Sequence, residues 1–206
     1  MNSTKIDVNY FSITDSSYAY FCGGPSPVEV KSIPYPLELM PADYEKYSGI
    51  LKISGRNGNL LLVGPKIYQG NEDAIDINHS NGIYIINAII GNGLPSKSQL
   101  ITIKGGSRDI HITGKFKSKT TKNFYIDIGN WSDQSYDYSA NITLELYSSD
   151  GKPIGVRIGR GKNITLLGNC VETKLESLKV KAYWYLKYFV RKLLKIKVNE
   201  RGPSWL

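Results

Sequence analysis

Two aspartates, Asp76 and Asp127, are the residues of this sequence best placed for acid–base chemistry. Each stands at the centre of a short alternating apolar segment, at residues 75–77 and 126–128. If these segments are strands with one strand between them, their backbones lie roughly 10 Å apart, because neighbouring strands are about 4.8 Å apart. Inverting glycosidases hold two carboxyl groups about 6.5–9.5 Å apart, which leaves room for a water. Together with Arg157, the pair is a candidate for polysaccharide cleavage.

The same residues also have a structural interpretation, which we favour. Lys52 occupies the strand position of Asp76 one segment earlier, and Arg157 occupies that of Asp127 one segment later. Opposite charges that face each other across neighbouring strands add about a few tenths of a kcal/mol each. The pattern therefore predicts a ladder of ion pairs, with catalysis as the alternative.

A repeat of about 25 residues, present five times from Leu51 to Val171, positions these side chains. The isoleucines that close the first strand of each copy are Ile53, Ile77, Ile103, Ile128 and Ile158. Just before each second strand stands an Asn or Asp, namely Asn59, Asn81, Asp109, Asn141 and Asn163. The second strands open at Leu60, Ile83, Ile110, Ile142 and Ile164, and a third apolar position follows at Ile67, Ile90, Phe116 and Val171. One copy cannot bury its apolar face alone, so the period predicts stacked coils.

Three strands per coil with stacked β-branched residues resemble the right-handed parallel β-helix of the pectate-lyase-like superfamily. The resemblance covers about 60 per cent of the chain. The segment 71–76, Asn-Glu-Asp-Ala-Ile-Asp, is similar to the Asn-x-Asp strand of polygalacturonases, but Ile101-Thr102 stands where their Asp-Asp pair would follow, and no Gly-His-Gly turn exists. The expected fold is all-β: a right-handed parallel β-helix of about five coils, with an irregular N-terminal cap and a C-terminal amphipathic α-helix.

The chain divides into three regions of a single domain. Residues 1–49, rich in Tyr and Pro, are expected to form the cap, and residues 50–173 the coils. Within the fourth coil, an aromatic and polar insertion at 131–138 must leave the wall of the helix. Such loops on rigid scaffolds often bind ligands. We therefore name three candidate ligand-binding residues: Trp131, Tyr136 and Tyr138.

Residues 174–206 are expected to form a basic amphipathic helix, from about Leu175 to Val198, and a tail. At 100° per residue, one face is apolar and is expected to seal the last coil; it holds Leu175, Leu178, Ala182, Tyr185, Leu186, Phe189, Leu193 and Ile196. Most of the Lys and Arg residues lie on the other face, with Trp184 and Tyr188 among them. The alternative is that the helix docks onto a partner through Leu178, Trp184, Leu186, Phe189, Arg191 and Leu193.

The second strands leave one apolar stretch on their outer side. It consists of Leu61, Val63, Tyr84 and Ile86. An exposed apolar patch of this size would be unusual for a monomer. We expect the N-terminal cap to cover it, with a subunit interface as the alternative.

The charge of the chain is concentrated at its C-terminal end. Of the formal net charge of +8, residues 174–206 carry +7. A basic surface over the whole body, as in nucleic-acid-binding domains, is therefore not expected. The two cysteines, Cys22 and Cys170, match no metal-ligand spacing, and no motif indicates a metal or cofactor. The first residues have no apolar core of the signal-peptide kind.

These patterns favour a non-enzymatic structural or attachment module that resembles the shafts of bacteriophage tailspike and related virion proteins. Its expected location is a virion or an extracellular surface, reached without a classical signal peptide. The expected partners are further copies of the chain, with a trimer favoured, or other virion proteins, and cell-surface polysaccharide. Neither nucleic acid nor a membrane is expected. The alternative function is a polysaccharide-degrading enzyme, a glycoside hydrolase or lyase, and a third is a lectin-like binder.

Overall fold

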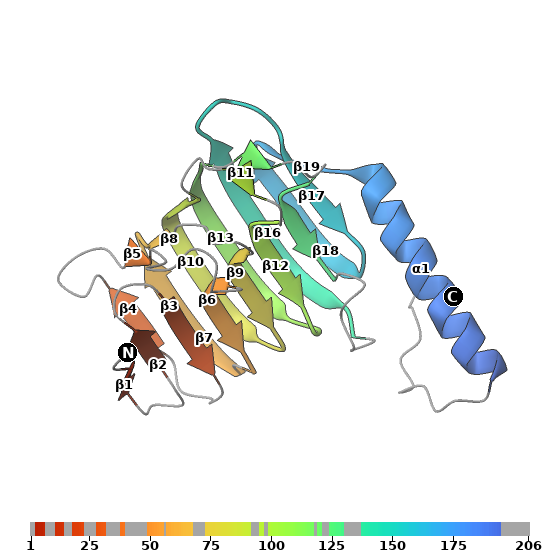
Figure 1. The fold of residues 1–206 in the computed structure, drawn as a ribbon, viewed down its shortest axis with the longest axis horizontal. Coiled ribbons are helices and arrows are strands. Elements are labelled where there is room, and N and C mark those ends of the chain that lie inside the picture. The colour runs from red at the N-terminus through yellow and green to blue at the C-terminus, as the bar shows by residue number, and fades with distance from the viewer. Residues whose placement is uncertain are drawn as a thin grey trace.

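Two parallel sheets make up most of the protein (Figure 1). The computed structural model describes residues 51–194, except residues 56, 68–72, 92–94, 97–98, 118, 121–123 and 130–136, and the backbone of the strands within residues 1–50. It describes only the backbone at 57–59, 95–96 and 119–120.

The first sheet has nine strands, in the order β1-β2-β3-β6-β9-β12-β15-β17-β19. These strands are β1 Ser3–Ile6, β2 Phe11–Thr14, β3 Tyr18–Cys22, β6 Gly49–Ser54, β9 Asp73–Asn78, β12 Ile101–Lys104, β15 Ile126–Ile128, β17 Ile154–Ile158 and β19 Cys170–Glu172. All neighbours are parallel except β1 with β2 and β2 with β3.

The second sheet has eight strands, six of them in the order β18-β16-β13-β10-β7-β4. These are β4 Val28–Lys31, β7 Asn57–Val63, β10 Asn81–Ile90, β13 Arg108–Phe116, β16 Ser139–Ser148 and β18 Gly161–Gly168. The other two are β8 Lys66–Ile67, which pairs with β10, and β5 Glu38–Leu39, which pairs with β8. A small sheet pairs β11 Pro95–Ser96 with β14 Lys119–Thr120. From β6 to β19, the long strands alternate between the two large sheets, and one helix, α1 Lys174–Leu193, follows.

The apolar positions of the repeat fill the space between these sheets. The predicted inward residues of the first strands are all buried, and Ile103 is fully inaccessible to solvent. The second strands confirm the prediction in the first four copies, from Leu60 to Leu144, while Ile164 and Leu166 at the last strand are only partly buried. Isoleucine suits these positions because its β-branched side chain packs well on a pleated surface. The hydrophobic period therefore predicted the core correctly.

The polar residues before the second strands make a ladder of turns. Asp109, Asn141 and Asn163 all have positive φ, between 51° and 55°. Asn and Asp tolerate this left-handed conformation better than other non-glycine residues. Their side chains bond from coil to coil: Asn141 Nδ2 donates to Asp109 Oδ1 at 2.8 Å, and Asn163 Nδ2 donates to Asn141 Oδ1 at 3.1 Å. In the second copy Gly82, not Asn81, adopts the left-handed conformation, with φ of 73°.

The third apolar position is confirmed in three copies and wrong in the last. Ile67, Ile90 and Phe116 are buried at the ends of second-sheet strands. Val171 is about half exposed, because β19 rejoins the first sheet beside β17 and turns Cys170 inward instead.

The N-terminal segment is more regular than the cap we expected. It contains five short strands, β1 to β5. Three of these strands extend the two sheets in parallel: β3 beside β6, β4 beside β7 and β5 beside β8. The antiparallel strands β1 and β2 then extend the first sheet beyond β3.

Candidate functional site

The candidate catalytic residues lie in one row across the first sheet. The register pairs Lys52 with Asp76, Asp76 with Thr102, Thr102 with Asp127, and Asp127 with Arg157. The row alternates with the core residues of the same strands, yet only Lys52 is substantially accessible, and the other four side chains are buried. The row is therefore a covered polar layer.

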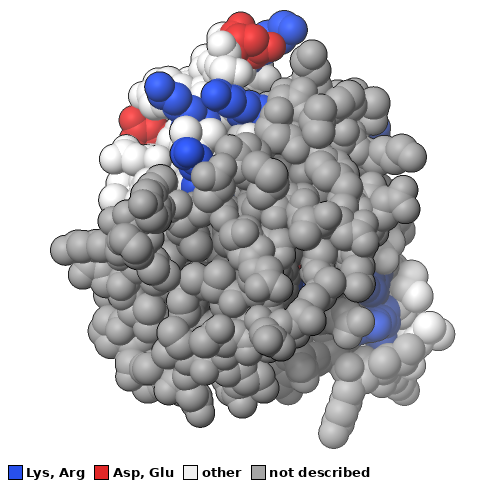
Figure 2. Space-filling model, turned by 60° about the vertical axis from the view of Figure 1, so that its left-hand side comes forward, with Lys and Arg blue, Asp and Glu red and all other residues white. Residues whose placement is uncertain are grey.

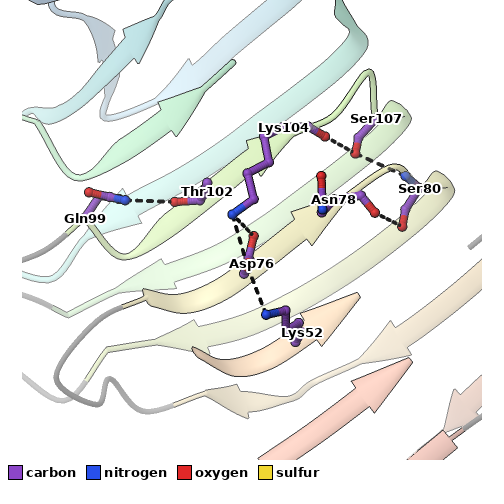
Figure 3. Close-up of polar contacts among 8 residues, drawn as sticks. All are labelled: Lys52, Asp76, Asn78, Ser80, Gln99, Thr102, Lys104 and Ser107. Carbon is purple, nitrogen blue, oxygen red and sulfur yellow. Dashed lines mark hydrogen bonds and ion pairs between the residues drawn. The ribbon is translucent and has the colours of Figure 1, made fainter. Parts of the chain in front are cut away.

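Two lysines hold Asp76 (Figure 3). Lys52 Nζ lies 3.8 Å from Oδ2, and Lys104 Nζ lies 3.2 Å from Oδ1. Lys104 Nζ also donates a hydrogen bond to Oδ2 at 3.3 Å. On the neighbouring strand, Gln99 Nε2 donates to Thr102 Oγ1 at 3.1 Å. The sequence predicted the contact with Lys52 and missed Lys104, which stands two residues after Thr102 on the next strand.

Asp127 and Arg157 form a bidentate ion pair inside the protein. Arg157 Nε donates to Asp127 Oδ1 at 3.0 Å, and a terminal guanidinium nitrogen of Arg157 donates to Asp127 Oδ2. Asp127 is 0% exposed and Arg157 is 5% exposed. The guanidinium carbon of Arg157 also lies 4.0 Å from the ring centre of Phe124. The planar guanidinium suits both contacts, because it binds a carboxylate through two nitrogens and stacks on aromatic rings.

This arrangement gives both aspartates a structural contact. Asp76 and Asp127 flank Thr102 on β12, so their backbones are two strand spacings, about 10 Å, apart. A glycosidase needs one carboxyl group that keeps its proton and donates it to the leaving oxygen. Both aspartates already contact lysine or arginine side chains, and catalysis at these residues stays a prediction.

A second polar network ties the turns between the sheets together (Figure 3). Ser80 Oγ donates to the carbonyl of Asn78 at 2.9 Å, and Ser107 Oγ donates to the carbonyl of Lys104 at 2.6 Å. The backbone N–H of Ser80 donates to Ser107 Oγ at 3.2 Å. Gly105 lies close to Asn78, so a side chain there would collide with it. These contacts join the turn that follows β9 to the turn that follows β12.

The predicted ligand-binding residues can be located only in part. Trp131 and Tyr136 lie outside the described residues. Tyr138 is partly exposed, with Lys162 Nζ 4.7 Å from its ring centre and the guanidinium of Arg160 at 5.8 Å. Arg160 also lies 4.4 Å from the ring centre of Trp184, so it stands between the insertion and α1. Neither cation was identified from the sequence, because each lies in a turn or at a strand end with no distinguishing motif.

The helix α1 contacts the coils through the face opposite to the one we predicted. Its buried residues are Ser177, Val180 and Trp184. Ser177 Oγ accepts a hydrogen bond from the backbone N–H of Ile158 at 2.8 Å, and Val180 packs against Gly159. The prediction that the broad apolar face seals the last strands is wrong, because the side with Val180 and Trp184 is the buried one. Val180 packs so closely on Gly159 that a Cβ atom at position 159 would collide with it.

The broad apolar face of α1 is therefore exposed. Leu178 and Leu186 are each 61% exposed and Leu193 is 67% exposed, while Leu175, Ala182, Tyr185 and Phe189 are exposed as well. Of the predicted docking residues, Trp184 is buried against the coils and Arg191 is partly buried. In Figure 1, α1 stands beside the C-terminal end of the sheets, and its far end lies away from them.

A groove of about 700 Å³ lies between α1 and the last coil. It is lined by Leu178, Lys181, Ala182, Tyr185 and Leu186 of α1, and by Tyr138, Gly159, Gly161 and Lys162. Its walls are mostly apolar, with lysines at the margins. A side chain at position 161 would meet the core, because a Cβ atom there would lie 2.9 Å from Cγ2 of Ile158.

The outer side of the second sheet carries the apolar stretch that we predicted. Val63 and Tyr84 are exposed, and Leu61 and Ile86 are partly exposed. The register places Tyr84 beside Leu61, and Ile86 beside Val63. This apolar stretch is therefore not fully buried by the rest of the chain.

Three groups of the described chain have perturbed acidity. A hydrogen bond and the negative charge of Glu145, 2.9 Å from the phenol oxygen, raise the pKa of Tyr147 above its usual value. Hydrogen bonds from Ser148 and from the backbone of Lys152 lower the pKa of Asp150 to about 2. Burial raises the pKa of the Cys170 thiol to about 11, so this thiol is a weak nucleophile at neutral pH.

The described residues contain no group of three or more His, Cys, Asp or Glu side chains that could hold a metal ion. Within the same part of the chain, no helix is long and apolar enough to cross a membrane. Figure 2 shows charges of both signs close together at its upper edge. Comparisons of the chain with protein-family models, curated proteins and solved structures find no match.

Proposed function

We propose that this protein is a non-enzymatic structural or attachment module, built on a right-handed parallel β-helix of about five coils. The alternation of strands between two parallel sheets supports this fold. The observation that carries the function is the state of Asp76 and Asp127, the two carboxylates placed for catalysis. Each is already held by basic side chains in a covered layer of the sheet. The most conspicuous polar row of the protein thus has a structural role.

The module resembles the shaft of a phage tailspike or related virion protein, and we propose that it contacts host-surface polysaccharide through the insertion at 131–138. Tyr138 supports this proposal, because its partly exposed ring lies beside Lys162 and Arg160. An aromatic ring can stack on the apolar face of a sugar, and the two cations suit an acidic polysaccharide. The proposed location is a virion or an extracellular surface.

We further propose lateral assembly of the coils into a homo-oligomer, with a trimer favoured. The apolar stretch formed by Leu61, Val63, Tyr84 and Ile86 supports this assembly, because it lies on the outer side of the second sheet and is incompletely covered. A subunit interface would remove this area from water.

Two measurements test the proposal. The purified protein is incubated with acidic polysaccharides, and reducing ends and unsaturated products are followed over time, with Asp76→Asn and Asp127→Asn as comparisons. We expect no cleavage, and cleavage that either substitution abolishes would establish the enzyme instead. Mass in solution is then compared between the native chain and Tyr84→Ser. A mass of three chains that falls in the variant supports lateral assembly, and one chain in both samples contradicts it.

A further inference from the structure

We propose that the C-terminal end of this protein, formed by β18 and the exposed face of α1, binds the N-terminal end of a second copy. The first observation is the apolar area of this end. Leu178, Leu186 and Leu193 are each more than 60% exposed, and the buried contact of α1 lies on its opposite side. The contact that fixes the helix therefore leaves this face free to bind another molecule.

The second observation is the open edge of the second sheet. β18 is the last strand at one end of this sheet and β4 is the last at the other, and neither pairs on its far side with a strand that the structure describes. Open strand edges expose backbone groups that favour pairing with another chain. All neighbours in this path are parallel, so β4 of a second copy laid beside β18 would continue the same sheet.

The groove joins these two features into one surface. It is bordered by Gly161 and Lys162 at the start of β18, and by Leu178, Ala182 and Leu186 of α1. A chain that pairs with the edge of β18 would thus bring its neighbouring residues against the apolar face of α1. A lipid surface suits this end poorly, because unpaired backbone groups of a strand edge are costly in hydrocarbon.

The third observation is that the sequences of the two terminal regions carry opposite net charge. The helix α1 contains six Lys or Arg residues and one Glu, and Lys162 adds another positive charge beside it. Residues 1–49 contain six Asp or Glu and three Lys. Complementary charge steers association and disfavours the wrong pairing. Two copies joined helix to helix would instead bring the basic flanks of both together, which favours the end-to-end arrangement.

This inference goes beyond the proposed lateral assembly, because an end-to-end contact does not close on itself and adds one unit after another. The unit that is added is whatever lateral assembly forms, one chain or three. Growth beyond that unit depends on the two ends, whereas the mass of the unit depends on the apolar stretch around Tyr84. The two proposals can therefore fail separately.

The test uses the full chain with two variants that each block one end. Leu178→Glu with Leu186→Glu blocks the C-terminal end, and Glu29→Lys with Glu38→Lys changes β4 and β5 at the N-terminal end. Mass is measured by sedimentation velocity over a hundredfold range of concentration. The average mass of the native protein should increase with concentration. In 0.5 M salt the apparent Kd of self-association should rise at least tenfold, because salt screens the charges. Lys115→Glu, which changes charge on β13, is the control and should grow like the native chain.

Mixing the two variants gives the deciding result. Each variant alone should stay at the mass of its unit, and an equal mixture should form a species of twice that mass, because one functional end of each kind remains. Three results would overturn the proposal. The native chain could stay at one mass at all concentrations; the N-terminal variant could still grow alone, as helix-to-helix pairing requires; or the chain could bind vesicles of anionic lipid without self-association.

Discussion

The replacement Arg157→Met tests the interpretation of the covered polar row most directly. Methionine keeps much of the length of the arginine stem but has no charge, so the variant leaves Asp127 buried without its guanidinium partner. In the native protein Asp127 is 0% exposed and accepts two hydrogen bonds from Arg157.

The expected loss of stability is far larger than the sequence suggested. From the strand pattern alone, this pair would contribute about a few tenths of a kcal/mol. Removal of one partner from a buried ion pair costs about 3–5 kcal/mol, because the other charge stays buried and uncompensated. In a chain of this size, each kcal/mol lowers Tm by about 2–4 °C. We therefore expect the variant to melt roughly 6–20 °C below the native protein.

The stability lost in Arg157→Met should also depend on pH, and the buried ion pair determines whether it increases or decreases as pH falls. Without the guanidinium, burial favours the neutral form of Asp127, so the folded variant takes up a proton more readily than the unfolded chain. Stability rises as pH falls wherever the folded state binds more protons. The stability difference between variant and native protein should thus shrink between pH 7 and pH 4.5. The double variant Asp127→Asn with Arg157→Met should recover part of the loss at pH 7.

Equilibrium unfolding in urea, followed by tryptophan fluorescence, measures these differences. Lys152→Met is the matched control, because Lys152 forms an ion pair with Asp150 at 3.3 Å on the exposed surface. That variant should unfold at the native urea concentration, since exposed ion pairs contribute little. If Arg157→Met unfolds within about 1 kcal/mol of the native protein at pH 7, or shows no pH dependence, the buried ion pair does not stabilise the fold as we argue.

Three further predictions concern other parts of the fold. Ile103→Asp should prevent folding, because an unpaired carboxylate at this fully buried position costs several kcal/mol; a soluble variant with a cooperative thermal transition would contradict the packing described above. Gly114→Ala should lower Tm by several degrees, because φ is 153° and a Cβ atom would approach the backbone of Ala88, whereas Gly151→Ala, with open space around it, should cost less. The carboxyl of Asp150 should titrate near pH 2 in NMR spectra, and Ser148→Ala should raise that pKa, since the hydroxyl is its largest stabilising contact; the stability that this group contributes is present above its unfolded pKa of about 3.9 and is lost as pH falls toward 2.

The strands, the turns and the contacts between neighbouring strands could be predicted from the sequence. They depend mainly on which side of a strand each residue faces, and this side follows from the alternation of apolar and polar residues. The alternation around Ile77, Ile103 and Ile128 predicted strands with a buried side, and the structure confirms these residues in the core. The Asn and Asp residues before the second strands predicted turns, and three of them adopt the left-handed conformation. Opposite charges at matching positions of neighbouring first strands predicted the contact of Asp76 with Lys52 and that of Asp127 with Arg157.

The tertiary structure decided what covers each surface. The pattern of α1 showed a broad apolar face and a basic face, and hydrophobicity alone assigned the broad face to the coils. The contact goes instead through Val180 and Trp184: Val180 packs against Gly159, and Ser177 on the same side of the helix accepts a hydrogen bond from the backbone N–H of Ile158. Burial of the Asp127–Arg157 pair likewise could not be read from strand alternation, which tells the two sides of a strand apart but not whether the outer side is covered. A sequence pattern shows the periodicity of one helix or strand. Burial of its side chains depends on the shape of the segments that pack against it, and these segments become neighbours only in the folded chain.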